Sequence, residues 1–503
     1  MTTALEQLKI RLAEISDLMS IGALLSWDQQ CYMPPGGAPA RARQLATLSK
    51  IAHELMTAKA TGELLAAAEG EAAALDYNSD DAALVRLARR EYDKETRLPT
   101  EWVAEFARTT TEAHEVWVKA RAENDYAAFA PWLEKIVALN RQRAEYLGYE
   151  DVPYDALLDL YEPRMKTADV RAIFDALKAE LVPLVRAVLA RADPVDDRVL
   201  YQDYDVEKQW QFGEDVIRAF GYDFARGRQD KAVHPFTTSF SINDVRITTR
   251  VDPQWLAPAL FATMHEAGHA LYDQGIALAL EGNILAGGAS LGVHESQSRL
   301  WENVVGRSRG FWEHYYPRLQ AVFPDQLGKV DLETFYRAIN KVSPSFIRVE
   351  ADELTYNLHI MLRFELENAL LDGDLSVADA PAAWNEKMEA LLGVRPPDDR
   401  QGILQDVHWS GGMIGYFPTY SLGNLLSAQL YEKAVADAPD IPSQIARGEF
   451  GGLLGWMRER VHRHGRKYLP TELVERAAGA PMQAQPYLAY LRAKYGAIYG
   501  LDA

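Results

Sequence analysis

The chain has 503 residues, of which 48% are hydrophobic and 25% are charged. These fractions are typical of a soluble globular protein, so they exclude an intrinsically disordered or fibrous chain. Acidic residues outnumber lysine and arginine by 72 to 53, which gives a formal net charge of −19 at pH 7. A surface this acidic repels polyphosphate, which disfavours nucleic acid as a partner.

Cysteine usage and hydropathy narrow the class of protein further. Cys31 is the single cysteine, which excludes an intrachain disulfide framework and a multi-thiolate metal site. Residues 1–24 mix acidic side chains into a helical pattern and lack the basic start and apolar core of a signal peptide. No apolar run approaches the ~18 residues that a membrane helix needs. We therefore expect a soluble, cytoplasmic protein with no membrane partner.

Most of the chain repeats apolar residues at the 3.6-residue period of an amphipathic helix, beginning with Leu5, Leu8, Leu12 and Ile15. After this first helix the pattern predicts helices over residues 38–57, 81–93, 101–122, 126–147, 167–192, 206–220, 253–274, 295–320, 332–340, 348–371, 379–392, 420–438, 441–463 and 471–498. The breaks between them contain Pro and Gly and are too short for interdomain linkers. We therefore predict one helical domain over residues 1–503.

One segment departs from the helical pattern. Residues 236–242 and 245–251 are rich in β-branched and aromatic side chains that nearly alternate, and Asn243-Asp244 stands between them. This order predicts a small antiparallel β-hairpin. Because the hairpin directly precedes the strongest motif, we expect its strands to serve the functional site. The alternative is a hairpin that only covers the core.

The strongest motif is His265-Glu266-Ala267-Gly268-His269, on a predicted helix that begins at Asp252-Pro253. Side chains four residues apart share a helical face, so both imidazoles can bind one ion while Glu266 is offset toward its water. The motif predicts His265 and His269 as metal ligands and Glu266 as the general base of a hydrolase. The alternative is a pair of helix-face histidines without a metal.

A catalytic zinc ion usually has three protein ligands and one water, and the water becomes a nucleophile while the ion polarises the scissile carbonyl. Glu295 follows His269 by 26 residues, which leaves room for a turn and an antiparallel helix, so we expect it to be the third ligand. His294 is the alternative. No third histidine extends the same segment, which favours a Glu-type zinc peptidase over the three-His class. Asp273 and Glu302 are candidates for orienting a ligand imidazole, or else solvated helix-face acids.

Seven short blocks, spread over nearly the whole chain, match one known family. In chain order they are Trp27-Asp28-Gln29 with Met33-Pro34, His234-Pro235-Phe236, residues 244–248, residues 265–269, residues 294–297, residues 347–352 and residues 402–409. The sequence thereby resembles the carboxypeptidase Taq family of thermostable metallocarboxypeptidases. Seven blocks in a fixed order are more specific than the metal motif alone.

The resemblance implies a mainly helical zinc-peptidase fold with a deep central groove, similar to oligopeptidases and angiotensin-converting enzyme. It implies a homodimer that removes C-terminal residues one at a time with broad specificity, using zinc on the three predicted ligands and Glu266 as base. Some members of the family prefer cobalt. The catalytic elements then span about residues 234–420, and the N-terminal helices, about residues 1–150, flank or cover the groove.

A carboxypeptidase needs a cation for the terminal carboxylate of its substrate, because burying that carboxylate unpaired is costly. Arg348, at the predicted start of a helix, is the family-matched candidate, and its alternative is a helix-face ion pair with Asp352. Arg246 on the hairpin is the second cation, which either closes the far end of the substrate site or holds the sheet to the body. The block at His234 adds this residue to the substrate-binding candidates.

His408 and the run from Gly415 to Tyr420 lie in a loop region, where functional side chains concentrate. Related helical zinc peptidases use a His and a Tyr, spaced like these, for hydrogen bonds to the transition state. By that resemblance we expect His408 and Tyr420 to be catalytic, with Tyr416 as the alternate. Two competing functions stay open: an endo-acting oligopeptidase with the same metal site, and a helical peptide-binding protein with a structural metal.

Overall fold

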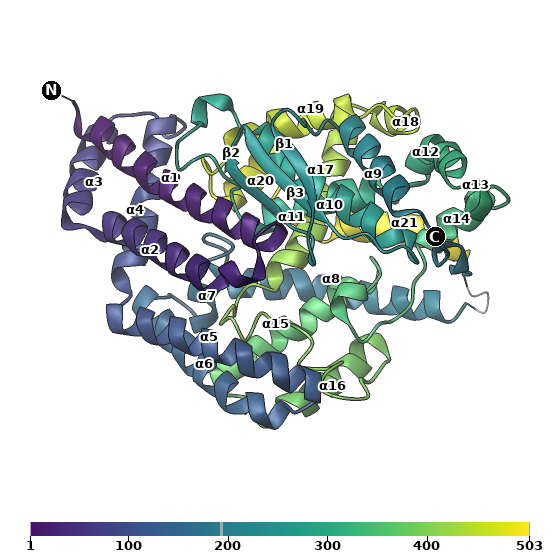
Figure 1. The fold of residues 1–503 in the computed structure, drawn as a ribbon, viewed down its shortest axis with the longest axis horizontal. Helices are drawn as coiled ribbons and strands as arrows, with labels where there is room; N and C mark the ends of the chain where they lie inside the picture. The colour runs from purple at the N-terminus through teal and green to yellow at the C-terminus, as the bar shows by residue number, and fades with distance from the viewer. Residues whose placement is uncertain (1, 192–194, 502–503) are drawn as a thin grey trace. The chain divides into compact units, whose positions relative to one another are not determined.

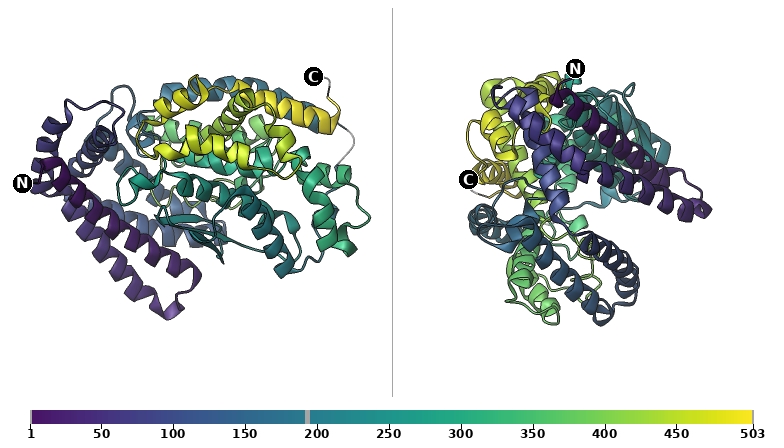
Figure 2. Two further views of the ribbon diagram at one scale, coloured as in Figure 1. Left: turned by 90° about the horizontal axis from the view of Figure 1, so that it is seen from above. Right: turned by 90° about the vertical axis from the view of Figure 1, so that its left-hand side faces the viewer.

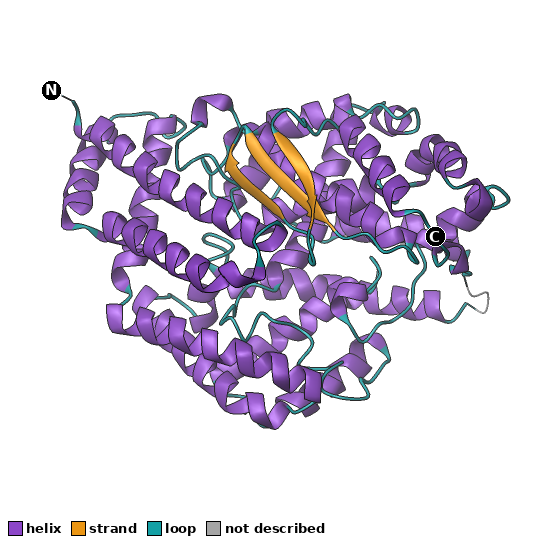
Figure 3. Ribbon diagram, in the orientation of Figure 1, coloured by secondary structure: helices purple, strands orange, loops and turns teal. Residues whose placement is uncertain are grey.

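The computed structural model describes residues 2–191 and 195–501. Within them the chain is mainly helical, as predicted, with one small sheet (Figure 3). The chain forms two compact units: unit 1 contains residues 1–96, 196–339 and 430–481, and unit 2 contains residues 97–195, 340–429 and 482–503. The metal motif belongs to unit 1, whereas Arg348, His408 and Tyr420 belong to unit 2. The single domain over residues 1–503 stays a prediction.

Unit 1 begins with four helices, α1 (Ala4–Cys31), α2 (Ala38–Thr57), α3 (Lys59–Ala72) and α4 (Asp80–Arg97) (Figure 1). A capping box starts α1, because the Thr3 hydroxyl accepts the N–H of Glu6 while the Glu6 carboxylate accepts the N–H of Thr3. α1 and α2 pack side by side (Figure 2). Arg41 of α2 fixes this pair by donating to the Asp28 carboxylate of α1 at 2.7 Å.

The rest of unit 1 includes α10, the helix that carries the metal motif. Its other α-helices are α9 (Val206–Phe220), α10 (Leu256–Gly275), α11 (Leu291–Arg299), α12 (Arg309–Val322), α13 (Pro324–Leu327), α14 (Leu332–Ile339), the second half of α17 (Pro418–Asp437), α18 (Ile441–Ile445), α19 (Gly451–Arg460) and α20 (Pro470–Ala478). The predicted helix over 295–320 is interrupted by a π-helical turn, Leu300–Val305, and a new start at Ser308. The Ser308 hydroxyl accepts the N–H of Phe311 and so caps α12.

Unit 2 is a helical assembly of its own. It contains α5 (Thr100–Glu123), α6 (Tyr126–Leu147), α7 (Pro153–Leu158), α8 (Thr167–Leu189), α15 (Tyr356–Asp372), α16 (Ala380–Leu392), α21 (Gln485–Tyr499) and the first half of α17 (Pro418–Asp437). Residue 192, at the predicted end of α8, lies outside the described residues. No helix among the described residues is long and apolar enough to cross a membrane.

The sheet belongs to unit 1 and has the strand order β1 (Gly227–Lys231), β3 (Asp244–Thr249), β2 (Thr237–Ser241) (Figure 1). β2 and β3 form the predicted antiparallel hairpin. β1 pairs with β3 in parallel, so the sheet is mixed and not purely antiparallel. The sequence did not predict β1, because Gly-Arg-Gln-Asp-Lys has no β-branched or aromatic side chain. Gly227 is required there, since a Cβ would collide with the Val245 carbonyl and the Tyr222 hydroxyl.

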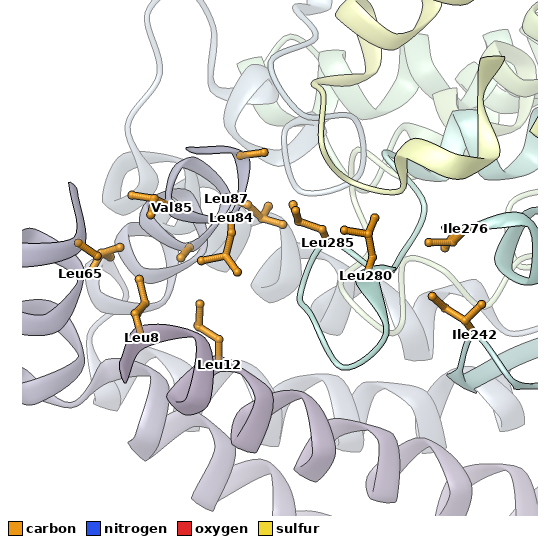
Figure 4. Packing of buried hydrophobic residues seen from close by; sticks show 13 residues of the cluster. Leu8, Leu12, Leu65, Leu84, Val85, Leu87, Ile242, Ile276, Leu280 and Leu285 are labelled. Carbon is orange, nitrogen blue, oxygen red and sulfur yellow. The ribbon is translucent and has the colours of Figure 1, made fainter. Parts of the chain in front are cut away.

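A hydrophobic cluster in unit 1 joins the N-terminal helices to the segment that follows α10 (Figure 4). Leu12 of α1 and Leu84 of α4 contribute fully buried side chains. Leu280 and Leu285, in the connection from α10 to α11, complete the same cluster. The cluster therefore holds this connection in place, and through it the start of α11.

We expect Leu12→Ala to lower the free energy of unfolding by roughly 2–5 kcal/mol, because it leaves a cavity where a side chain 2% exposed was packed. Leu24→Ala, in the same helix at a side chain 39% exposed, is the matched control and should change it by less than about 0.5 kcal/mol. Denaturant unfolding followed by circular dichroism measures both. Equal losses would contradict a core position for Leu12.

Candidate metal centre

Helix α10 presents the two motif histidines on one face, one turn apart. The helix begins at Leu256, after the predicted start at Asp252, because the Asp252 carboxylate accepts the N–H of Gln254 in a turn instead. The Nε2 atoms of His265 and His269 lie 3.6 and 3.5 Å from Oε2 of Glu295. These three ligand atoms lie within 4.8 Å of one another, and they form a candidate metal site among the described residues.

Gly268 lets the third ligand reach the site. A Cβ on Gly268 would lie 2.5 Å from the carbonyl oxygen of Gln297 and 2.6 Å from Cα of Ser298, so α10 and α11 touch here through their backbones. The Ser290 hydroxyl accepts the N–H of Val293 and fixes where α11 begins. Because of this close approach, a short glutamate side chain on α11 spans the distance to both histidines.

Glu302 orients His265. Its Oε2 lies 2.8 Å from His265 Nδ1, and a carboxylate only accepts, so Nδ1 donates and Nε2 keeps its lone pair for a metal. Arg299 donates to Glu295 at 2.7 Å and to Glu302 at 3.0 Å, which holds both carboxylates in place. Burial alone would raise the pKa of both, but Arg299 and the imidazoles outweigh it, so the pKa of Glu302 falls to about 2 and that of Glu295 lies lower still.

His294, the alternative third ligand, stands behind His269. Its Nδ1 lies 2.8 Å from Nδ1 of His269, and its Nε2 lies 3.0 Å from Oδ1 of Asp273. Asp273 accepts the Nε2 proton of His294, and a single proton shared between the two facing Nδ1 atoms forms the hydrogen bond between His294 and His269. This chain leaves the Nε2 lone pair of His269 facing Glu295. Asp273 and Glu302 therefore both contact the imidazoles of the candidate ligands, Asp273 through His294 and Glu302 directly.

The donor set fits a divalent metal. Two neutral imidazole nitrogens and one ionised carboxylate are the ligands of a catalytic zinc site that keeps one position open. Burial lowers the pKa of His269, which favours the neutral form that binds a metal. Burial alone would also lower the pKa of His265, but Glu295 and Glu302 raise it, so a metal competes with a proton for this imidazole.

Strand β2 holds the predicted base. The Thr237 hydroxyl lies 2.6 Å from Oε2 of the buried Glu266 and 2.9 Å from its carbonyl oxygen. This contact agrees with the expectation that the strands serve the site. His234 precedes β2 as an exposed side chain in the connection from β1.

Arg246 of β3 is committed to two local contacts. It donates twice to the Asp244 carboxylate, at 2.8 Å each, and its guanidinium lies 4.3 Å from the ring centroid of Trp27 in α1. A cation over an aromatic face is attractive, more so when partly buried. These contacts are those of the alternative in which Arg246 holds the sheet to the helical body.

In unit 2, Arg348 is 5% exposed and held by an acidic partner from another segment. It donates to Asp406 through Nε at 3.0 Å and Nη2 at 2.8 Å, and to the Tyr356 hydroxyl at 2.9 Å. The ion pair with Asp352 was wrong, because the Asp352 carboxylate accepts backbone N–H groups, among them that of Thr355. The helix predicted from Arg348 begins at Tyr356 for the same reason, and Arg348 lies in a 3₁₀ turn.

The predicted His and Tyr pair is assembled in unit 2. His408 Nε2 and the Tyr420 hydroxyl oxygen lie 3.2 Å apart, and the Tyr416 ring lies 5.2 Å from the His408 ring. Burial lowers the pKa of His408 to about 4, so its imidazole is neutral at pH 7. The Arg348 guanidinium lies 4.9 Å from the Tyr420 ring centroid. Unit 2 thus brings together four of the predicted residues.

Three supporting residues were not predicted from sequence. Arg299 had a local signal, because it stands four residues after Glu295 and three before Glu302, spacings that bring helical side chains together. Asp406 lies in the block 402–409 but gave no sign of its arginine partners. Thr237 had no signal at all.

Nearly the whole chain is similar to known metallopeptidases in sequence and in fold. A family model described as carboxypeptidase Taq (M32) metallopeptidase matches residues 7–495. Thermostable carboxypeptidase 1 of Thermus thermophilus is 45% identical over 97% of each chain. The crystal structure of an M32 carboxypeptidase from Deinococcus radiodurans is 47% identical, with 99% of both chains covered and a TM-score of 0.96. A Pyrococcus furiosus carboxypeptidase structure, 39% identical, covers 98% of this chain and 99% of its own with a TM-score of 0.95.

We expect Gly268→Ala to weaken divalent-metal binding roughly 10- to 100-fold, because the added methyl group forces α11 and Glu295 away from the histidines. Gly455→Ala is the matched control, since this glycine of α19 has open space around its Cβ position, and it should leave metal affinity unchanged. Competition with a chromophoric chelator measures both affinities. Parental affinity in Gly268→Ala would show that the close helix contact does not position Glu295.

Proposed function

This chain belongs to the carboxypeptidase Taq (M32) family of metallopeptidases, and on that premise we propose that its candidate metal centre removes C-terminal residues with broad specificity. Family and relatives make it a metal-dependent carboxypeptidase that acts on peptides. The observation that carries the proposal is the convergence of three ligand atoms, from His265, His269 and Glu295, beside the buried carboxylate of Glu266.

We assign zinc as the preferred metal, with cobalt as the second choice. The set of two imidazoles and one carboxylate supports zinc, as does the family resemblance. When bound, the metal supplies a Lewis acid for the scissile carbonyl and a water of lowered pKa. Glu266, oriented by Thr237, takes the proton of the attacking water and delivers it to the leaving amine.

We propose catalytic and substrate-binding roles for residues of unit 2 on the strength of the family resemblance. His408 and Tyr420 donate hydrogen bonds to the oxygen on which charge develops, and the neutral imidazole of His408 supports such a role. Arg348 pairs with the terminal carboxylate, for which a planar guanidinium is well suited. Tyr416 and His234 complete the substrate contacts, whereas Arg246 holds the sheet to α1 through its contacts with Asp244 and Trp27. Family resemblance supports these assignments.

Two competing functions were left open by the sequence, a peptide-binding protein and an endo-acting oligopeptidase. Family membership rejects a non-enzymatic peptide-binding protein and favours a carboxypeptidase over an endo-acting oligopeptidase. We also propose that the enzyme works in the cytoplasm as a homodimer, on the strength of the resemblance to its family.

A peptide with a free C-terminus should lose residues one at a time from that end, whereas the same peptide with a C-terminal amide should be cleaved at least about tenfold more slowly. The amide lacks the charge that Arg348 is proposed to bind. Timed mass spectrometry of both peptides, with and without a chelator, follows direction, residue preference and metal dependence together. Unimpaired cleavage of the amide would instead indicate an endo-acting enzyme.

Glu266→Gln should lower the rate of hydrolysis about 10²- to 10⁴-fold, because the amide cannot accept the proton of the attacking water. Metal content should stay near one ion per chain, which elemental analysis measures. Glu14→Gln, at an α1 side chain 58% exposed, is the control and should keep parental activity. Retained hydrolysis in Glu266→Gln would remove this residue as the base.

A further inference from the structure

We propose that Arg363 and Glu367, one turn apart on α15, are positioning residues that fix the His408 loop, residues 406–417, at two points. The proposal rests on the function proposed above for His408 and Tyr420, and it assigns to α15 the task of holding that pair in place. All residues involved belong to unit 2.

The first anchor lies at the start of the loop. Arg363 is fully buried, and its Nε and Nη2 atoms lie 2.7 and 2.5 Å from Oδ2 of Asp406. Its Nη1 donates to the carbonyl oxygen of His359, and the guanidinium lies 4.5 Å from the ring centroid of Trp384. A buried guanidinium needs a matching carboxylate, so Asp406 is held firmly two residues before His408.

The second anchor holds the loop at Trp409 and Gly415. Glu367 is fully buried, and its Oε1 accepts the indole N–H of Trp409 at 2.8 Å. Its Oε2 accepts the backbone N–H of Gly415 at 3.1 Å and the Tyr154 hydroxyl at 2.7 Å. Among the described residues no cation forms an ion pair with Glu367, and its three donors hold backbone and side chains in one arrangement.

Gly415 allows the loop backbone to come close enough to α7 for the second anchor to form. Its φ of +92° lies in the region that favours glycine, and a Cβ would lie 2.8 Å from the carbonyl carbon of Leu157 in α7. The loop backbone is therefore pressed between α7 and Glu367. Tyr416 follows directly.

The two anchors bracket the functional pair. Asp406 and Trp409 flank His408 on either side in the chain, and Gly415 stands five residues before Tyr420. The His408 ring packs at 4.5 Å on Phe417, and its Nε2 lies 3.2 Å from the Tyr420 hydroxyl. Because Arg363 and Glu367 act through Asp406, Trp409 and Gly415, a fault in either anchor displaces His408 relative to Tyr420.

Glu367→Gln tests the second anchor, because an amide has one acceptor oxygen where three donors converge. We expect faster hydrogen–deuterium exchange within residues 408–416, a kcat lower by about 10- to 100-fold, and unchanged KM and metal affinity. Glu365→Gln is the matched control: it lies on the same helix, is partly exposed and pairs with Lys178 and Lys387. This variant should match the parent in exchange and kcat.

Arg363→Lys tests the first anchor. It also keeps the proposal testable if Glu367→Gln fails to fold. It keeps the charge but loses the planar fork, so exchange should rise around residues 406–408 and kcat should fall. The exchange measurement needs no activity, so it separates this proposal from the proposed hydrolysis. The positioning role would be overturned if the anchor variants kept the parental exchange rate in the loop or the parental kcat, or if Glu365→Gln had equal effects. The proposed carboxypeptidase activity would still stand in each of these cases.

Discussion

The backbone contact between α10 and α11 at Gly268 is the constraint on which the metal centre depends. Two histidines one turn apart provide only half of a ligand set, and a third side chain must arrive from another element at short range. Gly268, within the motif, has no Cβ, and a Cβ at this position would collide with the backbone of α11. The cluster of Leu12, Leu280 and Leu285 then fixes the connection that delivers α11 to this contact.

Both units solve the same electrostatic problem in the same way. Largely buried carboxylates beside His265 and His269 are held by Arg299, and in unit 2 the largely buried Asp406 is held by Arg348 and Arg363. The carboxylates of Glu295, Glu302 and Asp406 are thus each paired with an arginine. Such pairing contributes little net stability after desolvation, but it leaves the functional side chains with fixed orientations and fixed protonation.

Local geometry made the candidate metal site predictable from the sequence, whereas the contacts between distant segments were not predictable. The spacing of His265 and His269 dictates a shared face on any helix, and the distance along the chain to Glu295 allows one antiparallel return. The partner of Arg348 was missed, because Asp406 lies 58 residues away and only tertiary packing brings it close. His294 was ambiguous for a related reason: its place behind His269 depends on its side-chain rotamer and on the contact with Asp273. The sequence did not predict strand β1, because its polar composition does not favour a strand. Its parallel pairing with β3 makes it one.

Each unit is assembled from three separate stretches of the chain, and this has a consequence for biosynthesis. Unit 1 needs residues up to 481, and unit 2 needs its last helix, α21, which packs on α8 and pairs Arg492 with Glu180. Neither unit is complete until nearly the whole chain has left the ribosome. The first helices of unit 1 therefore keep their apolar faces exposed until the later segments have been synthesised. We expect the pairing of segments that are distant in the chain to be the slow step of folding, and the exposed apolar faces to be accessible to chaperones.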